Sequence, residues 1–464
     1  MSGTFGGLST ALTALYAQRR GLEVAGQNIA NVNTEGYSRQ RIGLAAVGAP
    51  VRPALFAVGD PASGGVEVTD VARVRDEFLE ARAREEHGSS AYLGNQREVY
   101  SKIEQVIREP SDTGLQSQFS EFWNAWQSLA NRPGDLASRT ELLQRSSILT
   151  DSVRSAYDGI ASLWESTREQ FEVFVTEVNT TAQSVAKLNE AVVRTRQAGV
   201  PGNELADERD AAVLRLSQLT GSGSLLKEDG SVDVVVNGSS LVNGSHARPL
   251  GVYGAARLPD QAANPVGIRW TDNGAGASFT SGSVASALGT LNSTLPGIAG
   301  ALDGVAASLA TAVNTQHRAG FDLTGTAGGD LFTGTTAAAL TMAVTDPDLL
   351  AAASSAPVPP ATSTLDGGNA LAIADIATSP TGPDLGYRQV VVNLGVAAQS
   401  VNRRADIQSA ITEDADAARI AHSGVNLDEE MTNMITYQRA YEAAAKVMSV
   451  IDATLDSLIN SLRR

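Results

Sequence analysis

One long stretch without a proline constrains the fold of this chain more than any other feature. Residues 136–196 contain no proline and a single glycine, Gly159. Ordinary globular helices average about 11–12 residues, whereas a continuous helix over this stretch would be roughly 90 Å long. Such a length is typical of rods and bundles, so the sequence predicts an elongated, mainly helical molecule. The apolar residues that recur there at helical spacing are Val153, Ile160, Leu163, Phe171, Phe174, Val178, Val185, Leu188 and Val192.

Shorter helices are expected on both sides of this stretch. Helical spacing predicts a helix over residues 73–107, with a possible break at residues 87–90. The next helix should begin after an N-cap at Ser111 or Asp112, and Asn203 should cap another helix further along. Four aromatic side chains fall on one face of the helix after residue 112: Phe119, Phe122, Trp123 and Trp126. We expect them to form core packing rather than a ligand site.

The apolar pattern changes from helical to alternating in the middle of the chain. Asp229-Gly230 and two Asn-Gly steps lie between valine-rich runs, which predicts β-hairpins within residues 221–280. Residues 283–317 and 386–464 again have helical spacing, whereas residues 320–385 are rich in Ala, Gly, Thr and Pro and predict loops. The predicted fold is therefore mainly α, with long helices and a smaller β-rich section inserted in the middle.

The two ends of the chain both carry the pattern of an amphipathic helix. At the N-terminal end apolar residues step by three and four, which indicates a heptad seam. At the C-terminal end a similar seam lies beside a second stripe that includes Ile435, Val447 and Leu458, as is typical of a helix packed between several neighbours. The residues expected to form an assembly interface are Leu8, Leu12, Leu15, Leu22, Ile29, Met431, Met434, Tyr441, Met448, Ile451, Leu455 and Ile459.

Neither terminal helix has a compact domain of its own around it. Each large apolar side chain left in water forgoes roughly 1.5–3 kcal/mol, and a lone helix gains too little from its backbone to persist without tertiary contacts. We therefore expect the two ends to pair with each other and with copies from neighbouring subunits, as terminal coiled-coil helices. In the monomer they should be poorly ordered, and they should become ordered on assembly.

Charge and composition exclude several classes of partner and site. A formal net charge of -16 argues against a nucleic-acid partner and against docking on an anionic membrane. The chain has no cysteine, which removes disulfides, thiolate zinc sites and cysteine nucleophiles. Bacterial proteins often carry few cysteines, and the absence also suits a chain that crosses into an oxidising space. We expect neither a secretory signal nor a membrane-spanning run of about 20 apolar residues.

No catalytic, metal or cofactor site is predicted. The histidines His87, His246, His317 and His422 are far apart in sequence and match no metal-binding spacing, so we expect them on the surface or in loops. The acidic residues 428–430 begin the last helix, where negative charge favours the helix dipole. The sequence contains no P-loop, dinucleotide fingerprint or GxSxG motif. We therefore expect a protein that is not an enzyme.

The stretch NIANVNTEGYSRQ, residues 28–40, ends the first helix in an unusual way. Asparagine tolerates the left-handed conformation that ends helices, and Gly36 can take a positive φ without steric cost. The local chemistry therefore predicts a helix end followed by a fixed turn. The residues assigned to this motif are Asn28, Asn31, Thr34, Gly36 and Tyr37.

This stretch resembles the signature of the bacterial flagellar axial proteins, a family of rod, hook and hook-associated proteins. Further segments are similar to the hook-associated members, occur in the family's order and span nearly the whole chain. They are GVEVTDVARVRDEFLEARAR, EPSDTGLQSQFSEFWNAWQSLANRPGDLASR, ELADERDAAVLRL, NTQHRAGFDLTGTAGGDLF and SGVNLDEEMTNMITYQRAYEAAAKVMSVIDATLDSLI. The ordered set is far more specific than the first stretch alone.

The resemblance implies a structural protein built in layers. Gly36 and Tyr37 would hold a fixed bend between an inner and an outer layer. The implied domains are an inner coiled coil of residues 1–40 and 425–464, a helical rod-like middle of residues 41–220 and 281–424, a β-rich section of residues 221–280, and a reduced outer lobe drawn from residues 221–280 or 320–385.

The resemblance also implies a place and partners. Identical copies would form a ring segment between the hook protein and a second hook-associated protein, and so join the hook to the filament outside the cell. The chain would leave through the flagellar type III export channel without a cleaved signal peptide, with an export chaperone bound beforehand at its C-terminal region. We expect no nucleic-acid partner and no membrane partner.

Two alternatives stay open. Another axial subunit, such as a hook or distal rod protein, would share the terminal signatures but should lack the helical run of residues 73–217. An axial scaffold with an embedded enzyme would need a catalytic constellation within residues 221–385, and the sequence offers none there.

Overall fold

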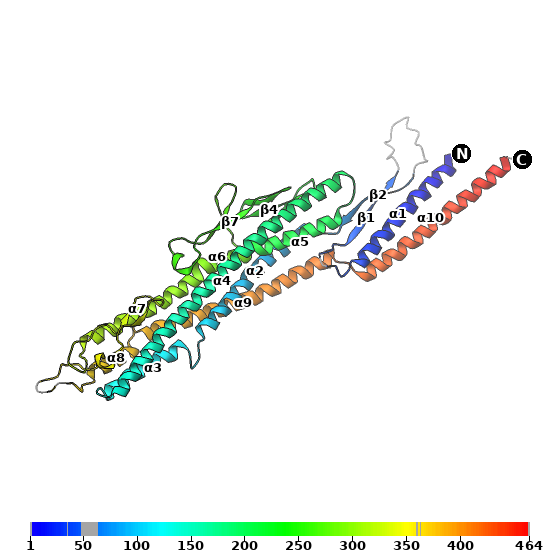
Figure 1. Cartoon of the computed structure of the whole chain (residues 1–464). Helices are drawn as coiled ribbons and strands as arrows, with labels where there is room; N and C mark the ends of the chain where they lie inside the picture. The colour runs from blue at the N-terminus through cyan, green and yellow to red at the C-terminus, as the bar shows by residue number, and fades with distance from the viewer. Residues whose placement is uncertain (1, 35, 48–63, 359–360, 362, 463–464) are drawn as a thin grey trace. The chain divides into compact units, whose positions relative to one another are not determined.

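The computed structural model describes residues 2–34, 36–47, 64–358, 361 and 363–462 (Figure 1). It is 65% helical with 11% strand, which confirms the predicted mainly α fold with a smaller β portion. The chain divides into two compact units. Unit 1 comprises Met1–Gly88, Asn179–Arg248 and Ala410–Arg464, and unit 2 comprises Ser89–Val178 and Pro249–Ser409. The expected division into inner, middle and outer layers stays a prediction.

The α-helices and strands of the described residues have the following bounds. The helices are α1 (Ser2–Ala30), α2 (Glu77–Ile107), α3 (Leu115–Asn131), α4 (Leu136–Gln197), α5 (Asn203–Thr220), α6 (Gly282–Gly289), α7 (Leu295–Ala319), α8 (Gly368–Ala374), α9 (Pro383–Ser423) and α10 (Leu427–Leu462). The strands are β1 (Gln40–Val47), β2 (Gly65–Arg73), β3 (Gly223–Leu226), β4 (Val232–Val236), β5 (Ser239–Asn243), β6 (His246–Ala247), β7 (Leu250–Tyr253), β8 (Gly267–Trp270), β9 (Gly276–Ala277), β10 (Phe332–Thr333) and β11 (Thr341–Met342).

The long helix predicted from the proline-free stretch is present as α4, which runs for 62 residues. Helix α2 also continues through residues 87–90, where a break was possible. One side of α4 is fully buried, because its apolar residues recur on a single face. The members of that face with no exposed surface include Leu142, Leu149, Val153, Ile160, Phe171, Val178 and Val185. Burial of this stripe, rather than backbone propensity alone, stabilises so long a helix.

The predicted N-cap of α3 was wrong. The residue before the helix is Gly114, and neither Ser111 nor Asp112 caps it. The carboxylate of Glu109 instead accepts a hydrogen bond from the Gln116 backbone N–H at 2.9 Å. A side chain outside the local turn therefore satisfies one of the free N–H groups that a Ser or Asp cap normally satisfies.

The four aromatic side chains of α3 form part of the core of unit 2, as predicted. Phe119, Phe122 and Trp126 have no exposed surface and Trp123 has 5%. The Trp123 indole N–H donates to the Asp384 carboxylate at 2.7 Å, so the polar edge of this ring is satisfied. Burial raises the pKa of Asp384.

His317 contradicts the expectation that the histidines occupy surface or loop positions, because its side chain is fully buried. Its Nδ1–H donates to the Gly329 carbonyl at 2.7 Å, and its Nε2 accepts from the Ala351 N–H at 3.0 Å. These partners fix the neutral tautomer. Burial lowers the pKa of His317 below its ordinary value of 6.5. A sequence spacing argument about metal sites could not detect this structural role.

This histidine predicts a loss of stability in mild acid. The neutral ring is favoured in the folded chain, so the stabilisation is complete above pH 6.5 and is lost as the pH falls from 6.5 towards the lower folded pKa. Chemical unfolding followed by tryptophan fluorescence at pH 7 and pH 5 should show this decline. The decline should be smaller in His317→Gln and unchanged in His422→Gln, whose histidine is exposed. Equal declines in all three proteins would contradict the assignment.

The sequence predicts no membrane-spanning run, but the helical stretch Gly282–Ala319 is long and apolar enough to cross a membrane by length and composition. Its large apolar side chains are nevertheless packed inside unit 2, since Leu291, Leu302, Leu309 and Val313 have no exposed surface. We therefore regard this stretch as a core helix.

The β-rich section within residues 221–280 is present as predicted. Strands β3 to β6 form an antiparallel sheet in unit 1, and β7 to β9 form another in unit 2. The β4–β5 hairpin turns at Asn237-Gly238, where both residues have positive φ, 44° and 79°. Asn-Gly is the preferred sequence for such a two-residue turn. Of the predicted loop region 320–385, residues 320–358 are mostly loops, with the two-residue strands β10 and β11 and a short 3-10 helix at Pro347–Leu349. The prediction was wrong for residues 368–378, which form helix α8 and a following 3-10 turn, and α9 already begins at Pro383.

Candidate functional site

The motif that follows α1 forms a compact turn. The Thr34 hydroxyl donates to Asn31 Oδ1 at 3.1 Å, and the Thr34 N–H donates to the Asn31 carbonyl at 2.9 Å. The Tyr37 N–H donates to the Thr34 carbonyl at 3.2 Å. Gly36 has a φ of +79°, a conformation that glycine adopts without steric cost. The predicted helix end and turn are therefore both present.

Asn28 is the centre of a buried polar cluster that contains Tyr37, Gln40 and Glu430. The Asn28 side chain is 1% exposed. Its Oδ1 accepts from the Tyr37 hydroxyl and the Gln40 N–H, and its Nδ2 donates to the Gln40 carbonyl and to Glu430 Oε2, each at 2.9 Å. All four hydrogen-bonding positions of the amide are thus used. We call these four residues the Asn28 cluster.

Arg39 joins the same turn to the start of α10. Its Nε and Nη2 both lie 2.8 Å from Glu430 Oε1, and its Nη1 lies 2.8 Å from Glu429 Oε2. The Arg39 N–H also donates to the Ser423 carbonyl, the last residue of α9, at 3.0 Å. Charge-assisted bonds of this kind are stronger than neutral ones. They fix the N-terminal turn against the beginning of the last helix.

A second set of contacts joins the turn to α5. The Ser38 N–H donates to Asp207 Oδ2 at 3.1 Å. The guanidinium of Arg73 lies 2.9 Å from Asp207 and 2.7 Å from Asp210. These charged groups are largely buried, so removing one partner would leave another charge unpaired.

Asn203 has a different role from the predicted one. It is the first residue of α5, and the N-cap position is Gly202. Its side-chain NH2 donates to the Gln40 side-chain oxygen at 3.0 Å and to the Val71 carbonyl at 2.8 Å. The amide links α5 to the β1–β2 pair instead of capping its own helix.

The Tyr37 hydroxyl remains a hydrogen-bond donor at every physiological pH. Burial, followed by the charges of Asp207, Glu204 and Glu430, raises the pKa of Tyr37 to about 12. The phenol therefore keeps the proton that it donates to Asn28. Among the motif residues, Asn28 and Tyr37 meet in the cluster, whereas Asn31 and Thr34 shape the neighbouring turn.

The terminal helices α1 and α10 lie side by side in opposite directions within a single chain (Figure 1). This pairing replaces the expectation that both helices are poorly ordered in the monomer, and the predictions below treat them as an ordered pair. Asn28 meets Glu430, Gly21 meets Tyr437 and Gly7 meets Ile451. Moving seven or fourteen residues towards the start of α1 corresponds to moving the same number of residues towards the end of α10, as expected of two antiparallel helices. A Cβ placed on Gly21 would lie 2.7 Å from the Tyr437 ring, so glycine is required for this close approach.

Gly21→Ala should therefore weaken the terminal pair, whereas Gly26→Ala should not. The added methyl group of the first variant overlaps the Tyr437 ring, and such overpacking typically costs about 1–3 kcal/mol. Gly26 has open space around its Cβ position, so alanine there should stabilise α1 by roughly 0.5–1 kcal/mol. Thermal unfolding followed by circular dichroism should give a lower melting temperature for Gly21→Ala than for Gly26→Ala. Equal melting temperatures would contradict the packing of α1 on α10.

The predicted interface residues divide into two groups in the structure. The half-buried group contains Leu8, Leu15, Leu22, Ile29, Met434, Met448, Ile451 and Leu455. The exposed group contains Leu12, Met431, Tyr441 and Ile459. Five further exposed apolar residues on α10 are Leu427, Ile435, Val447, Val450 and Leu458. Pairing with α1 thus covers only part of the apolar surface of α10.

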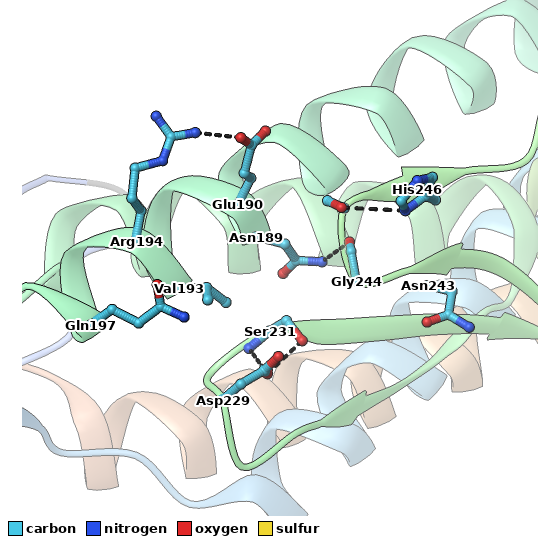
Figure 2. Close-up of a pocket in the computed structure, with 11 residues that line it drawn as sticks. Asn189, Glu190, Val193, Arg194, Gln197, Asp229, Ser231, Asn243, Gly244 and His246 are labelled. Atoms are coloured by element: carbon cyan, nitrogen blue, oxygen red, sulfur yellow. Dashed lines mark hydrogen bonds and ion pairs between the residues drawn. The ribbon is translucent and has the colours of Figure 1, made fainter.

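A cavity of about 380 Å³ lies between α4 and the β3–β6 sheet in unit 1 (Figure 2). Its polar groups are already bonded to one another: Asn189 Nδ2 donates to the Gly244 carbonyl at 2.7 Å, and Ser231 donates to Asp229. Glu190 pairs with Arg194. We assign no ligand to it. Among the described residues no group of three or more His, Cys, Asp or Glu side chains could hold a metal ion.

Several segments of the chain match models of known protein families. Residues 100–332 match the model of the flagellar hook-associated protein FlgK helical domain. The chain belongs to the FlgK family of flagellar hook-associated proteins. Residues 8–37, which include most of α1 and the motif residues, match the flagella basal body rod protein family. Residues 418–462, which include α10, match the flagellar basal body rod FlgEFG protein C-terminal family. The predicted family resemblance is confirmed, and the protein is a component of the bacterial flagellum.

Named relatives agree with this family. Flagellar hook-associated protein 1 of Bacillus subtilis is 28% identical over 504 residues, which cover 100% of this chain and 99% of the relative. The protein of that name from Escherichia coli is 28% identical, over 70% of this chain and 59% of the relative. The solved flagellar hook junction protein FlgK from Burkholderia pseudomallei has a TM-score of 0.64 at 16% identity, over 74% of this chain and 99% of that one. The last comparison shows a shared fold.

Proposed function

We propose that this chain is a structural junction protein that joins the flagellar hook to the filament through a second hook-associated protein. The proposal rests on the apolar surface of α10 that pairing with α1 leaves exposed. Its residues Met431, Ile435, Val447 and Val450 are each about half exposed, at 51%, 47%, 51% and 57%. Met431 and Ile435 lie one helical turn apart, as do Val447 and Val450, and exposed apolar pairs of this kind on one helix favour an interaction site.

We propose that neighbouring copies of the same chain bind this surface. In a ring segment, each terminal pair would be flanked by neighbouring pairs, and the apolar residues on both flanks of α10 would become buried. The hook protein and the second hook-associated protein would contact the two ends of the ring. The Asn28 cluster, Ser38 and Arg39 support this role, because their hydrogen bonds hold the terminal pair against α5 and against the end of α9.

We further propose export through the flagellar type III channel without a cleaved signal peptide. The absence of cysteine means that the unfolded chain cannot crosslink on the way. An export chaperone would bind the C-terminal region and shield the apolar stripes of α10 before export. The protein would then function outside the cell, without enzymatic activity. The match of the FlgK helical domain over residues 100–332 supports this role over that of a hook or distal rod subunit.

Electron microscopy of cells that lack this protein tests the proposal. We expect hooks of normal length without filaments, together with flagellin in the medium, and recovery of filaments when the gene is restored. Cells that build normal filaments without the protein would contradict the junction role. Cells without hooks would instead indicate a rod or hook subunit.

A further inference from the structure

A cavity of about 390 Å³ in unit 1 is lined in part by the turn that follows α1. Gly36 and Ser38 of the turn contribute to it, together with residues at the start of α2, in α5 and near the end of α9. Positive charge is concentrated there, although the chain as a whole has a net charge of -16. We call it the arginine cavity, after the four arginines that line it: Arg75, Arg84, Arg215 and Arg419.

The carboxylates that line the arginine cavity are already engaged by other arginines. Asp210 alone pairs with three guanidinium groups, which belong to Arg73, Arg75 and Arg209. Asp207 pairs with Arg73 at 2.9 Å. Glu80 lies 2.6 Å from Arg75 but 3.8 Å from Arg84. The charge of Arg84 is therefore only weakly compensated by the carboxylates of the cavity.

Arg84 and Arg419 also keep unused hydrogen-bond donors. The Nε atom of each is buried and has no hydrogen-bond partner among the described residues. Nη2 of Arg419 lies 3.4 Å from Asp416, and the same carboxylate pairs with His87 at 2.9 Å. Buried donors without a partner are rare in folded proteins, and a water molecule or an ion is a common explanation for them.

The arginines of the cavity repel one another. Burial lowers the pKa of Arg84, and the neighbouring charges of Arg75 and Arg419 lower it further, whereas Glu80 opposes the change. A pKa shift in this direction means that the charged guanidinium is less favourable here than in water. An anion among these side chains would offset the repulsion and supply acceptors for the unused donors.

We propose that the arginine cavity binds a small oxyanion of the phosphate or sulfate class between Arg84 and Arg419. Guanidinium groups bind such anions through paired N–H bonds, which are stronger than hydrogen bonds between neutral groups. The oxygens of a tetrahedral anion point in several directions, so one anion can accept from arginines on two helices. It would join α2 to the end of α9 and stabilise the part of unit 1 that lines the turn. Because this property belongs to the single chain, it holds or fails independently of the junction role.

Amide hydrogen exchange of the purified full-length chain tests the proposal. Exchange is measured in sodium phosphate and in sodium chloride at the same pH and ionic strength. We expect phosphate to slow exchange at least threefold in residues 77–88 and 410–423, to reach saturation as its concentration rises, and to leave residues 295–319 of unit 2 unchanged. Equal slowing in both units would indicate a general salt effect. That result, or no slowing at all, would overturn the proposal.

Variants of the two arginines locate the site. Arg84→Gln and Arg419→Gln should each raise the phosphate concentration that gives half-maximal protection at least tenfold. The control, Arg403→Gln, removes an exposed arginine of unit 2 and should leave that concentration unchanged. Full protection in both glutamine variants would overturn the assignment to this cavity.

A carboxylate probe separates the two kinds of anion that arginines bind. Succinate replaces phosphate in the same exchange measurement on the wild-type chain, so this comparison does not depend on the folding of any variant. We expect succinate to protect residues 77–88 and 410–423 less than phosphate does. Protection by succinate without protection by phosphate would overturn the choice of a tetrahedral anion and would indicate a carboxylate ligand.

Discussion

Asn28→Asp is expected to destabilise the terminal helices by several kcal/mol at neutral pH. The substitution keeps the shape of the side chain but removes the NH2 group that donates to the Gln40 carbonyl and to Glu430. A new carboxylate would then lie beside the carboxylate of Glu430, which is 3% exposed. Breaking a buried polar network in this way costs about 3–5 kcal/mol.

Amide hydrogen exchange measures this effect where it should occur. The four tryptophans Trp123, Trp126, Trp164 and Trp270 all belong to unit 2, so fluorescence would miss a change confined to unit 1. We expect exchange in residues 20–34 and 427–440 to accelerate at least a hundredfold in Asn28→Asp, and to slow again in mild acid as one carboxylate takes up a proton. Asn31→Asp, the control, removes one exposed bond and should change little. Unchanged exchange in Asn28→Asp would show that the cluster does not stabilise the helix pair.

Val447→Asp should leave the single chain folded and abolish filament attachment. Val447 is 51% exposed, so a carboxylate there stays in water in the monomer. In the proposed ring the same charge would be buried, at a cost of several kcal/mol in every copy. Motility in soft agar and counts of filament-bearing hooks measure the result.

Lys446→Asp is the matched control for this substitution. It changes the charge by a larger amount at the adjacent position, which is exposed and already carries a charge, so filaments should form normally. A filament count in Val447→Asp equal to that of the control would mean that this flank of α10 has no neighbour. Met434→Asp and Leu455→Asp should also prevent incorporation, but these half-buried residues would affect the pairing with α1 as well, so Val447 gives the cleaner test.

The elements that local pattern dictates could be predicted from the sequence. The absence of proline from residues 136–196 predicted α4, the spacing of aromatic residues predicted the core of α3, and Asn237-Gly238 predicted a hairpin turn. In each case the deciding residues lie within a few turns of one another. The turn after α1 could be predicted for the same reason, since Asn31, Thr34 and Gly36 determine it locally.

The contacts that hold the candidate site together depend on residues far apart in the sequence. Glu430 is 402 positions from Asn28, and its position in the first turn of α10 gave a sufficient local explanation for a carboxylate. Asn203 had the sequence pattern of a helix cap, but β1 and β2 offer its side chain better partners. His317 is buried for a similar reason, because its two partners come from loops that local pattern does not place.

Cysteine labelling at Val447 tests most directly whether neighbouring subunits bury the apolar flanks of the terminal helices. The chain has no cysteine, so Val447→Cys introduces a single thiol whose reaction with a maleimide can be followed in the purified monomer and in isolated hook–filament structures. We predict rapid labelling of the monomer and at least tenfold slower labelling in the assembled flagellum. Equally rapid labelling in both states would contradict the account.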